Sequence, residues 1–191
     1  MRGGGSPVER ARPARTFLLT PDRVALAVLT ALITLLFADV LLGINSLYIR
    51  DLAHFHYPTK HLLREIVLDG HFPWWNPYTS AGQPLAANPQ HEVFYPLTWL
   101  ILLPSFGVGF SLLIVSHLYI AVWGMYAFLR SLELTPAAAF FGAASFALGG
   151  LGLSYLNLLP FLFSVVWIPL ICLFARAWLR SGRRRDFALA A

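Results

Sequence analysis

Hydrophobic residues in this chain are gathered into long runs separated by polar segments, a pattern that predicts helices crossing a membrane. Crossing about 30 Å of hydrocarbon takes about 20 residues at roughly 1.5 Å per helical residue. Four runs approach or exceed that length, at residues 24–44, 106–129, 137–156 and 158–179. A fifth run, over residues 93–104, is too short to span and ends at Pro104. We predict a re-entrant or interfacial helix there.

Between the first two runs lies a polar segment, residues 45–96, that differs from the rest of the chain. It holds five of the six histidines and four of the nine acidic residues. Inside it, Pro58 suits the first turn of a helix and Gly70 its end, with apolar residues at helical spacing between them. This predicts a short amphipathic helix on the outer membrane surface. Prolines and two Asn-Pro pairs across His71–Pro89 predict an ordered, turn-rich path.

Composition and charge support a membrane protein and argue against nucleic-acid binding. Hydrophobic residues make up 58% of the 191 residues and charged residues 12%, and the mean hydropathy is +0.65. A soluble domain of this length needs more polar surface. The pI is near 9.8, but the arginines sit at helix ends that share one side of the membrane if the N-terminus is cytoplasmic. That orientation places the loop of residues 45–96 on the outer side of the membrane.

The ends of the chain and its cysteine add three expectations. Residues 1–20 are Arg-rich and predict a disordered cytoplasmic arm, and the run over 21–44 is longer than a signal-peptide core, so we expect a retained anchor. Residues 180–191 begin basic and turn apolar, which predicts the start of another helix and a fragment of a longer protein. Cys172 is the only cysteine, which excludes disulfides within the chain. The predicted class is an all-α, polytopic transmembrane protein with a long ordered first extracytoplasmic loop.

Three polar residues in or beside the spans are candidates for function. Asp51 follows the first predicted helix, where it is either an ordinary interfacial charge or a partly desolvated general base. Asp39 interrupts that helix, so it either faces a polar cavity or extends outward to water. His117 lies midway along the second span, where one interhelical hydrogen bond is the simpler explanation.

The loop also carries candidate ligands for ions. His54 and His56 form a DxxHxH cluster with Asp51 that could hold a divalent cation, provided folding supplies further ligands; neutral hydrogen bonding is the alternative. Lys60 and Arg64, with Arg50, could hold a phosphate at the outer surface. Their alternative role is to balance the acidic residues of the same helix.

Aromatic and amide side chains in the loop fit two functions. Trp74 and Trp75 could belong to an interfacial aromatic belt. Aromatic rings beside amides also suit a carbohydrate, whose C–H face stacks on a ring while its hydroxyls need polar partners. The amides in question are Asn76, Gln83, Asn88 and Gln90.

Several motifs occur in a fixed order through the loop. RDLAHFHYP is followed by GHFPWWNPYTSAGQPLAANPQ and then by FYPLTWL. This order, from the first span to Leu103, resembles the opening of the bacterial YfhO-like membrane proteins, which are similar to the GT-C superfamily of glycosyltransferases. The spans after Pro104 match only in being hydrophobic.

The resemblance implies a GT-C-like enzyme that takes a sugar from a polyprenyl-phosphate carrier and passes it to a cell-envelope acceptor on the outer face. The acceptor would be a polysaccharide, a teichoic-acid-like polymer or a protein. In such enzymes an acidic residue of the first external loop is a base or positions the acceptor, and the matching residue here is Asp51. Lys60 or Arg64 would stabilise the departing phosphate.

Two functions of other classes remain open from the sequence. One is a non-enzymatic transporter or lipid-carrier flippase component, in which Asp39 and His117 would line a pathway. The other is a structural subunit of an envelope assembly complex that binds a partner through the loop.

Overall fold

The predicted all-α class is confirmed by the computed structural model, which describes residues 20–190. The described residues are 72% helix and 2% strand. The predicted Arg-rich arm, apart from its last residue, lies outside the described residues.

Three helical segments of the described chain are long and apolar enough to cross a membrane, which identifies the chain as a membrane protein. The first is α4 (Phe106–Ser131). The second, Pro136–Asn157, runs through α5 (Pro136–Leu148), α6 (Gly150–Ser154) and η4 (Tyr155–Asn157). The third, Leu159–Ser181, consists of α7 (Leu159–Val165) and α8 (Ile168–Ser181), and α9 (Arg184–Ala190) follows it.

The residues expected to form one helix over 24–44 form two. Helix α1 (Thr20–Leu36) is 17 residues long and is followed, after a break at Phe37, by the short helix α2 (Ala38–Leu41). Asp39 lies in the first turn of α2. A negative charge is favourable there, because the free backbone N–H groups at the start of a helix carry partial positive charge. The side chain that interrupts the apolar run therefore marks the second helix.

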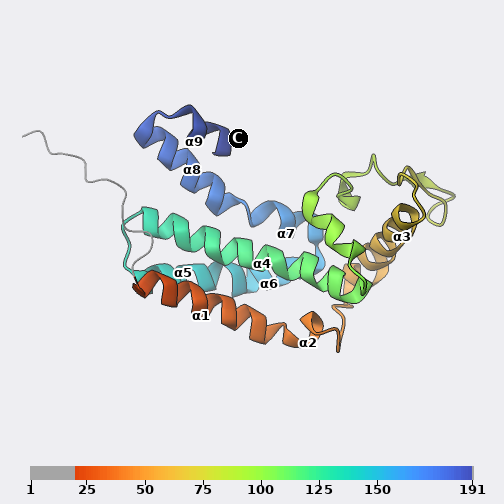
Figure 1. Ribbon diagram of the computed structural model, residues 1–191, viewed down its shortest axis with the longest axis horizontal. Coiled ribbons are helices and arrows are strands. Elements are labelled where there is room, and N and C mark those ends of the chain that lie inside the picture. The colour runs from red at the N-terminus through yellow and green to blue at the C-terminus, as the bar shows by residue number, and fades with distance from the viewer. Residues whose placement is uncertain (1–19, 191) are drawn as a thin grey trace, which may run out of the picture.

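The spanning helices pack around α4, and α1 and α5 lie along it (Figure 1). Polar contacts fix the two ends of the α1–α4 pair. Near the start of α1, the buried Asp22 accepts hydrogen bonds from Arg130 Nε and Tyr126 Oη, both at 2.6 Å. Further along, Thr34 Oγ1 lies 2.7 Å from Tyr119 Oη.

The loop of residues 45–96 gathers at the end of the bundle where α4 begins (Figure 1). It starts with the π-helix η1 (Leu52–His56) and the helix α3 (Tyr57–Leu68), and Gly70 turns the chain after α3 with φ +81°. Two two-residue strands, β1 (Trp75–Asn76) and β2 (Gln83–Pro84), pair antiparallel with Trp75 opposite Pro84. Two 3₁₀ helices follow, η2 (Pro89–His91) and η3 (Pro96–Leu102). The short apolar run near 93–104 thus forms the 3₁₀ helix η3.

Helix η3 and the first turns of α4 meet without side chains between them. A Cβ atom on Gly109 would overlap the carbonyl oxygen of Leu100 and lie 3.1 Å from the Cα atom of Ile101. Gly107, two residues earlier in the same helix, has space, because its nearest neighbour would be Ser46 Oγ at 3.6 Å. This contact fixes the exit of the loop relative to the bundle.

We predict that Gly109→Ala destabilises the protein by about 2 kcal/mol or more, because backbone atoms must move to admit the methyl group. Gly107→Ala is the matched control and should gain up to about 1 kcal/mol from helix propensity. Unfolding of both variants in detergent micelles, followed by circular dichroism, measures the difference. Equal stabilities of the two variants would contradict the close contact.

Candidate functional site

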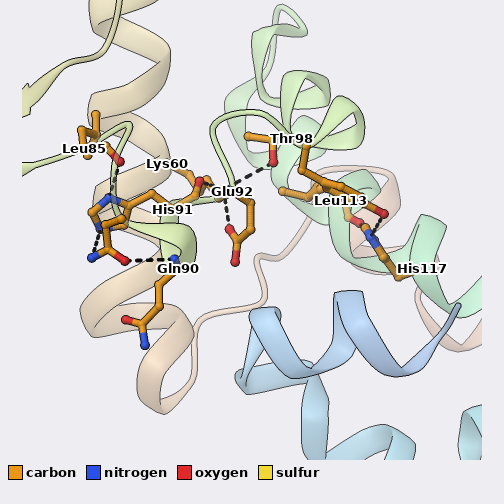
Figure 2. A network of polar contacts seen from close by, with 10 residues as sticks. Lys60, Leu85, Gln90, His91, Glu92, Thr98, Leu113 and His117 are labelled. Carbon is orange, nitrogen blue, oxygen red and sulfur yellow. Dashed lines mark hydrogen bonds and ion pairs between the residues drawn. The ribbon is translucent and has the colours of Figure 1, made fainter. Parts of the chain in front are cut away.

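The loop is organised around a buried lysine. Lys60, on α3, is 1% exposed. Its Nζ atom donates to the backbone oxygen of His91 at 2.5 Å, to Glu92 Oε2 at 2.7 Å and, at the long limit of 3.5 Å, to Thr98 Oγ1. We call Lys60, His91, Glu92 and Thr98 the Lys60 cluster (Figure 2). An ammonium group has three donors, and all three are used.

Local sequence explains how the acceptors reach Lys60 from a segment 31 to 38 residues further along the chain. Asn88 caps η2 by accepting a hydrogen bond from the backbone N–H of Gln90 at 3.0 Å. Glu92 ends η2 in the left-handed conformation, with φ 45° and ψ 40°. Pro96 then starts η3, which carries Thr98 inward. The turn at Glu92 brings its own side chain to the lysine.

His91 strengthens the same segment. Its Nδ1 atom lies 2.9 Å from the backbone oxygen of Leu85, so Nδ1 carries the proton and donates it. Nε2 is then the acceptor that faces Asn88 Nδ2 at 3.5 Å. The ring is 1% exposed. Residues 85–91 are therefore held by a neutral histidine.

Burial dominates the electrostatics of the cluster. It lowers the pKa of the Lys60 ammonium, an effect that the Glu92 carboxylate partly opposes. It likewise raises the pKa of Glu92, which Lys60 partly opposes. Desolvation and the charge of Lys60 lower the pKa of His56 to about 4, and burial lowers the pKa of His91. Both histidines are neutral at pH 7.

Asp51 is exposed on the surface of the loop. It directly precedes η1, and its side chain caps no helix. Within residues 20–190 no hydrogen bond or ion pair engages its carboxylate, which acts on His56 only through its charge. Arg50, the preceding residue, is exposed and has φ 44°. Within residues 20–190, Asp51 is thus a carboxylate without a partner that follows a strained and likewise unpaired Arg50.

The two cations expected to bind phosphate have other partners. Lys60 is enclosed in its cluster, and Arg64 Nη2 donates to the backbone oxygens of Leu103 and Pro104, both at 3.2 Å. Arg64 therefore caps the connection between η3 and α4. His54 is exposed and His56 is 4% exposed, so the DxxHxH pattern divides between surface and interior.

Of the aromatic and amide residues expected to bind a sugar, some are exposed or free and others hold the loop together. Trp74 is 70% exposed, whereas the Trp75 ring covers Gly82, where a Cβ would lie 2.6 Å from the indole. Asn76 is buried and holds its own turn through Thr79 Oγ1 and the backbone N–H of Tyr78. Gln83 lies in β2 and Asn88 caps η2. Among the described residues the Gln90 amide group stays free, as Figure 2 shows.

The two polar residues expected in or near the spans have protein partners. Asp39 Oδ2 accepts from Asn45 Nδ2 at 3.1 Å on the surface. His117 is fully buried, with Nδ1 2.6 Å from Leu113 O and Nε2 2.8 Å from Tyr95 Oη. Tyr95 Oη also accepts from Trp167 Nε1 at 3.1 Å. His117 thus joins α4 to the start of η3.

Metal ligands are not assembled in the part of the chain that the structure describes. No group of three or more His, Cys, Asp or Glu side chains there could hold a metal ion. His54, His56 and Asp51 differ in exposure and direction, which explains why the sequence pattern does not become a site.

Glu92 and Tyr95 hold central positions that the sequence did not single out. In the sequence Tyr95 stands out only as part of the motif FYPLTWL. A signal existed for both, because an acidic residue and a tyrosine stand between two prolines, Pro89 and Pro96, that fix the path of the segment.

Comparison with known proteins adds no relative. No protein-family model, no curated protein and no solved structure matches this chain.

We predict that Lys60→Met lowers the free energy of unfolding by about 3 kcal/mol or more, because it leaves Glu92 buried without its cation. Adding Glu92→Leu should restore much of the loss, since an apolar pair of similar volume avoids both desolvation costs. Chemical unfolding in micelles of the two single variants and the double variant gives the coupling. Additive losses would show that the pair is not a unit.

We also predict that acid weakens the loop. Between pH 6.5 and about 4 the unfolded chain takes up a proton that folded His56 does not, so stability falls as the pH falls, by up to about 1.4 kcal/mol per unit. Burial also lowers the pKa of His91, so His91 contributes to the same loss of stability as the pH falls. Unfolding measured at pH 7 and pH 4.5 should show a smaller loss for His56→Gln than for the unmodified protein. An identical loss would remove His56 as the cause.

Proposed function

We propose that this chain belongs to a GT-C-like membrane glycosyltransferase of the bacterial plasma membrane, with its N-terminus in the cytoplasm. It would transfer a sugar from a polyprenyl-phosphate carrier to a polysaccharide, teichoic-acid-like or protein acceptor on the outer face. The supporting observation is the free, exposed carboxylate of Asp51, carried by an ordered loop at the end of the spanning helices (Figure 1). The motif order that resembles YfhO-like proteins lies in this same loop.

The position of Asp51 suits a donor whose carrier is held in lipid. The residue comes ten positions after the end of α2 and directly before η1, in the loop at the end of the spanning bundle (Figure 1). A polyprenyl tail stays in the bilayer, so the sugar phosphate must react where the bundle meets water. Asp51 is available there, because no protein donor occupies its oxygens within residues 20–190.

In the proposed step the acceptor hydroxyl oxygen forms a bond to the anomeric carbon. The bond from that carbon to the phosphate oxygen breaks, and its electron pair leaves with the phosphate. Asp51 takes the hydroxyl proton as general base. Arg50 is the exposed cation beside it and would stabilise the departing phosphate, because Lys60 and Arg64 are engaged elsewhere.

The transport function has less support. Its expected pathway residues were Asp39 and His117. His117 is sealed by Tyr95, Leu113 and the Phe163 ring, which stacks on it at 3.8 Å. Asp39 is on the surface.

We predict that Asp51→Asn abolishes sugar transfer, because an amide cannot accept the proton. The assay follows labelled sugar from a polyprenyl-phosphate carrier in membranes containing the protein. Asp69→Asn is the matched control, since Asp69 is an exposed aspartate of the same loop and should leave transfer unchanged. Full transfer by the Asp51 variant at equal membrane level would remove the catalytic assignment.

A further inference from the structure

The Glu92 carboxylate carries one oxygen that the fold leaves without a partner. Oε2 accepts from Lys60 Nζ at 2.7 Å. Oε1 is buried, and no hydrogen bond reaches it from the described residues. Leaving a buried acceptor unpaired costs about 1–3 kcal/mol, and native proteins contain few such atoms. The oxygen is therefore an acceptor in need of a donor.

The neighbouring residues do not supply that donor. The three ammonium protons of Lys60 go to His91 O, Glu92 Oε2 and Thr98 Oγ1. Figure 2 shows the second carboxylate oxygen directed away from both Lys60 and Thr98. A donor to Oε1 would therefore come from outside the described residues.

The backbone at Glu92 is also held at a cost. Its φ of 45° and ψ of 40° are left-handed, a conformation that costs a non-glycine residue about 1 kcal/mol or more. Glycine or asparagine would make the same turn more easily. A residue needed only for the turn would not have to be a buried carboxylate, so the side chain itself has a use.

Charge and surroundings narrow the donor to a neutral hydroxyl. A second cation would be repelled by Lys60, and an anion by Glu92 itself. Gln90 and Phe94, on either side of Glu92, are both exposed, Phe94 at 75%. The Glu92 side chain is 9% exposed, so part of it reaches the surface of the loop. A carboxylate, a free amide and an exposed ring together suit a sugar.

We propose that Glu92 is a binding residue that accepts a hydrogen bond through Oε1 from a hydroxyl group of a sugar. The proposal rests on the transfer function given above, in which Asp51 remains the base. Glu92 holds the sugar, and Lys60 holds Glu92 in place through its hydrogen bond to Oε2.

Direct binding of methyl hexosides tests this role without any transfer reaction. The protein in lipid nanodiscs is titrated with methyl mannoside, glucoside and galactoside and with their monodeoxy analogues, by calorimetry. Glu92→Gln should weaken binding about tenfold or more, since it replaces a charged acceptor. The deoxy sugar that lacks the bound hydroxyl should bind the unmodified protein as weakly as the intact hexoside binds Glu92→Gln. Its affinity should not fall further in the Glu92→Gln variant.

The control variant is Glu65→Gln, an exposed glutamate of α3, which should bind as the unmodified protein does. If Glu92→Gln fails to fold, the infrared carboxylate band of the unmodified protein serves instead and should shift on adding the hexoside. Unchanged affinity in a folded Glu92→Gln, no hexoside binding by the unmodified protein, or no band shift would each overturn the proposal. If the unmodified protein binds hexosides but transfers no sugar, the proposed function alone would be overturned.

Discussion

The ordered loop depends on the burial of one ammonium group. Lys60 is taken out of water on α3 and can remain charged only if acceptors surround it. All of them come from residues 91–98, so the segment after the hairpin must return to α3. Thr98 on η3 and the close contact between η3 and α4 then tie this arrangement to the spanning bundle. A loop built from turns and prolines thereby acquires a fixed position.

The polar residues of the loop differ in whether their side chains hold the loop together or remain available to a ligand. Four side chains form hydrogen bonds that hold the loop and its connection to α4: Lys60, Arg64, Asn76 and Asn88. Asp51, Arg50 and the Gln90 amide remain open to solvent. These free groups are a carboxylate, a cation and an amide, which the proposed sugar transfer would use. Much of the polar content of the loop thus serves to hold a few reactive groups in place.

Hydrophobic pattern was enough to predict the all-α class, the α3 helix and the turn at Gly70. It could not predict the break at Phe37, because apolar residues continue on both sides and only Asp39 marks the second helix. Nor could spacing show that Lys60 is buried, because its partners lie 31 to 38 residues away and pair only after the chain has turned at Glu92. Burial of His56, which spacing could not show either, separates it from the exposed Asp51 and His54, so the DxxHxH pattern carried little information about a metal.

The Lys60 cluster should hold residues 85–98 as rigidly as the helix they contact. Amide hydrogen exchange of the protein in lipid nanodiscs tests it most directly. The N–H groups of Leu85, His91 and Thr98, which donate to backbone oxygens of Trp74, Asn88 and Tyr95, should exchange about as slowly as those of α3. Exchange at the rate of an unstructured peptide would contradict the account, because the loop would then have no fixed site to present.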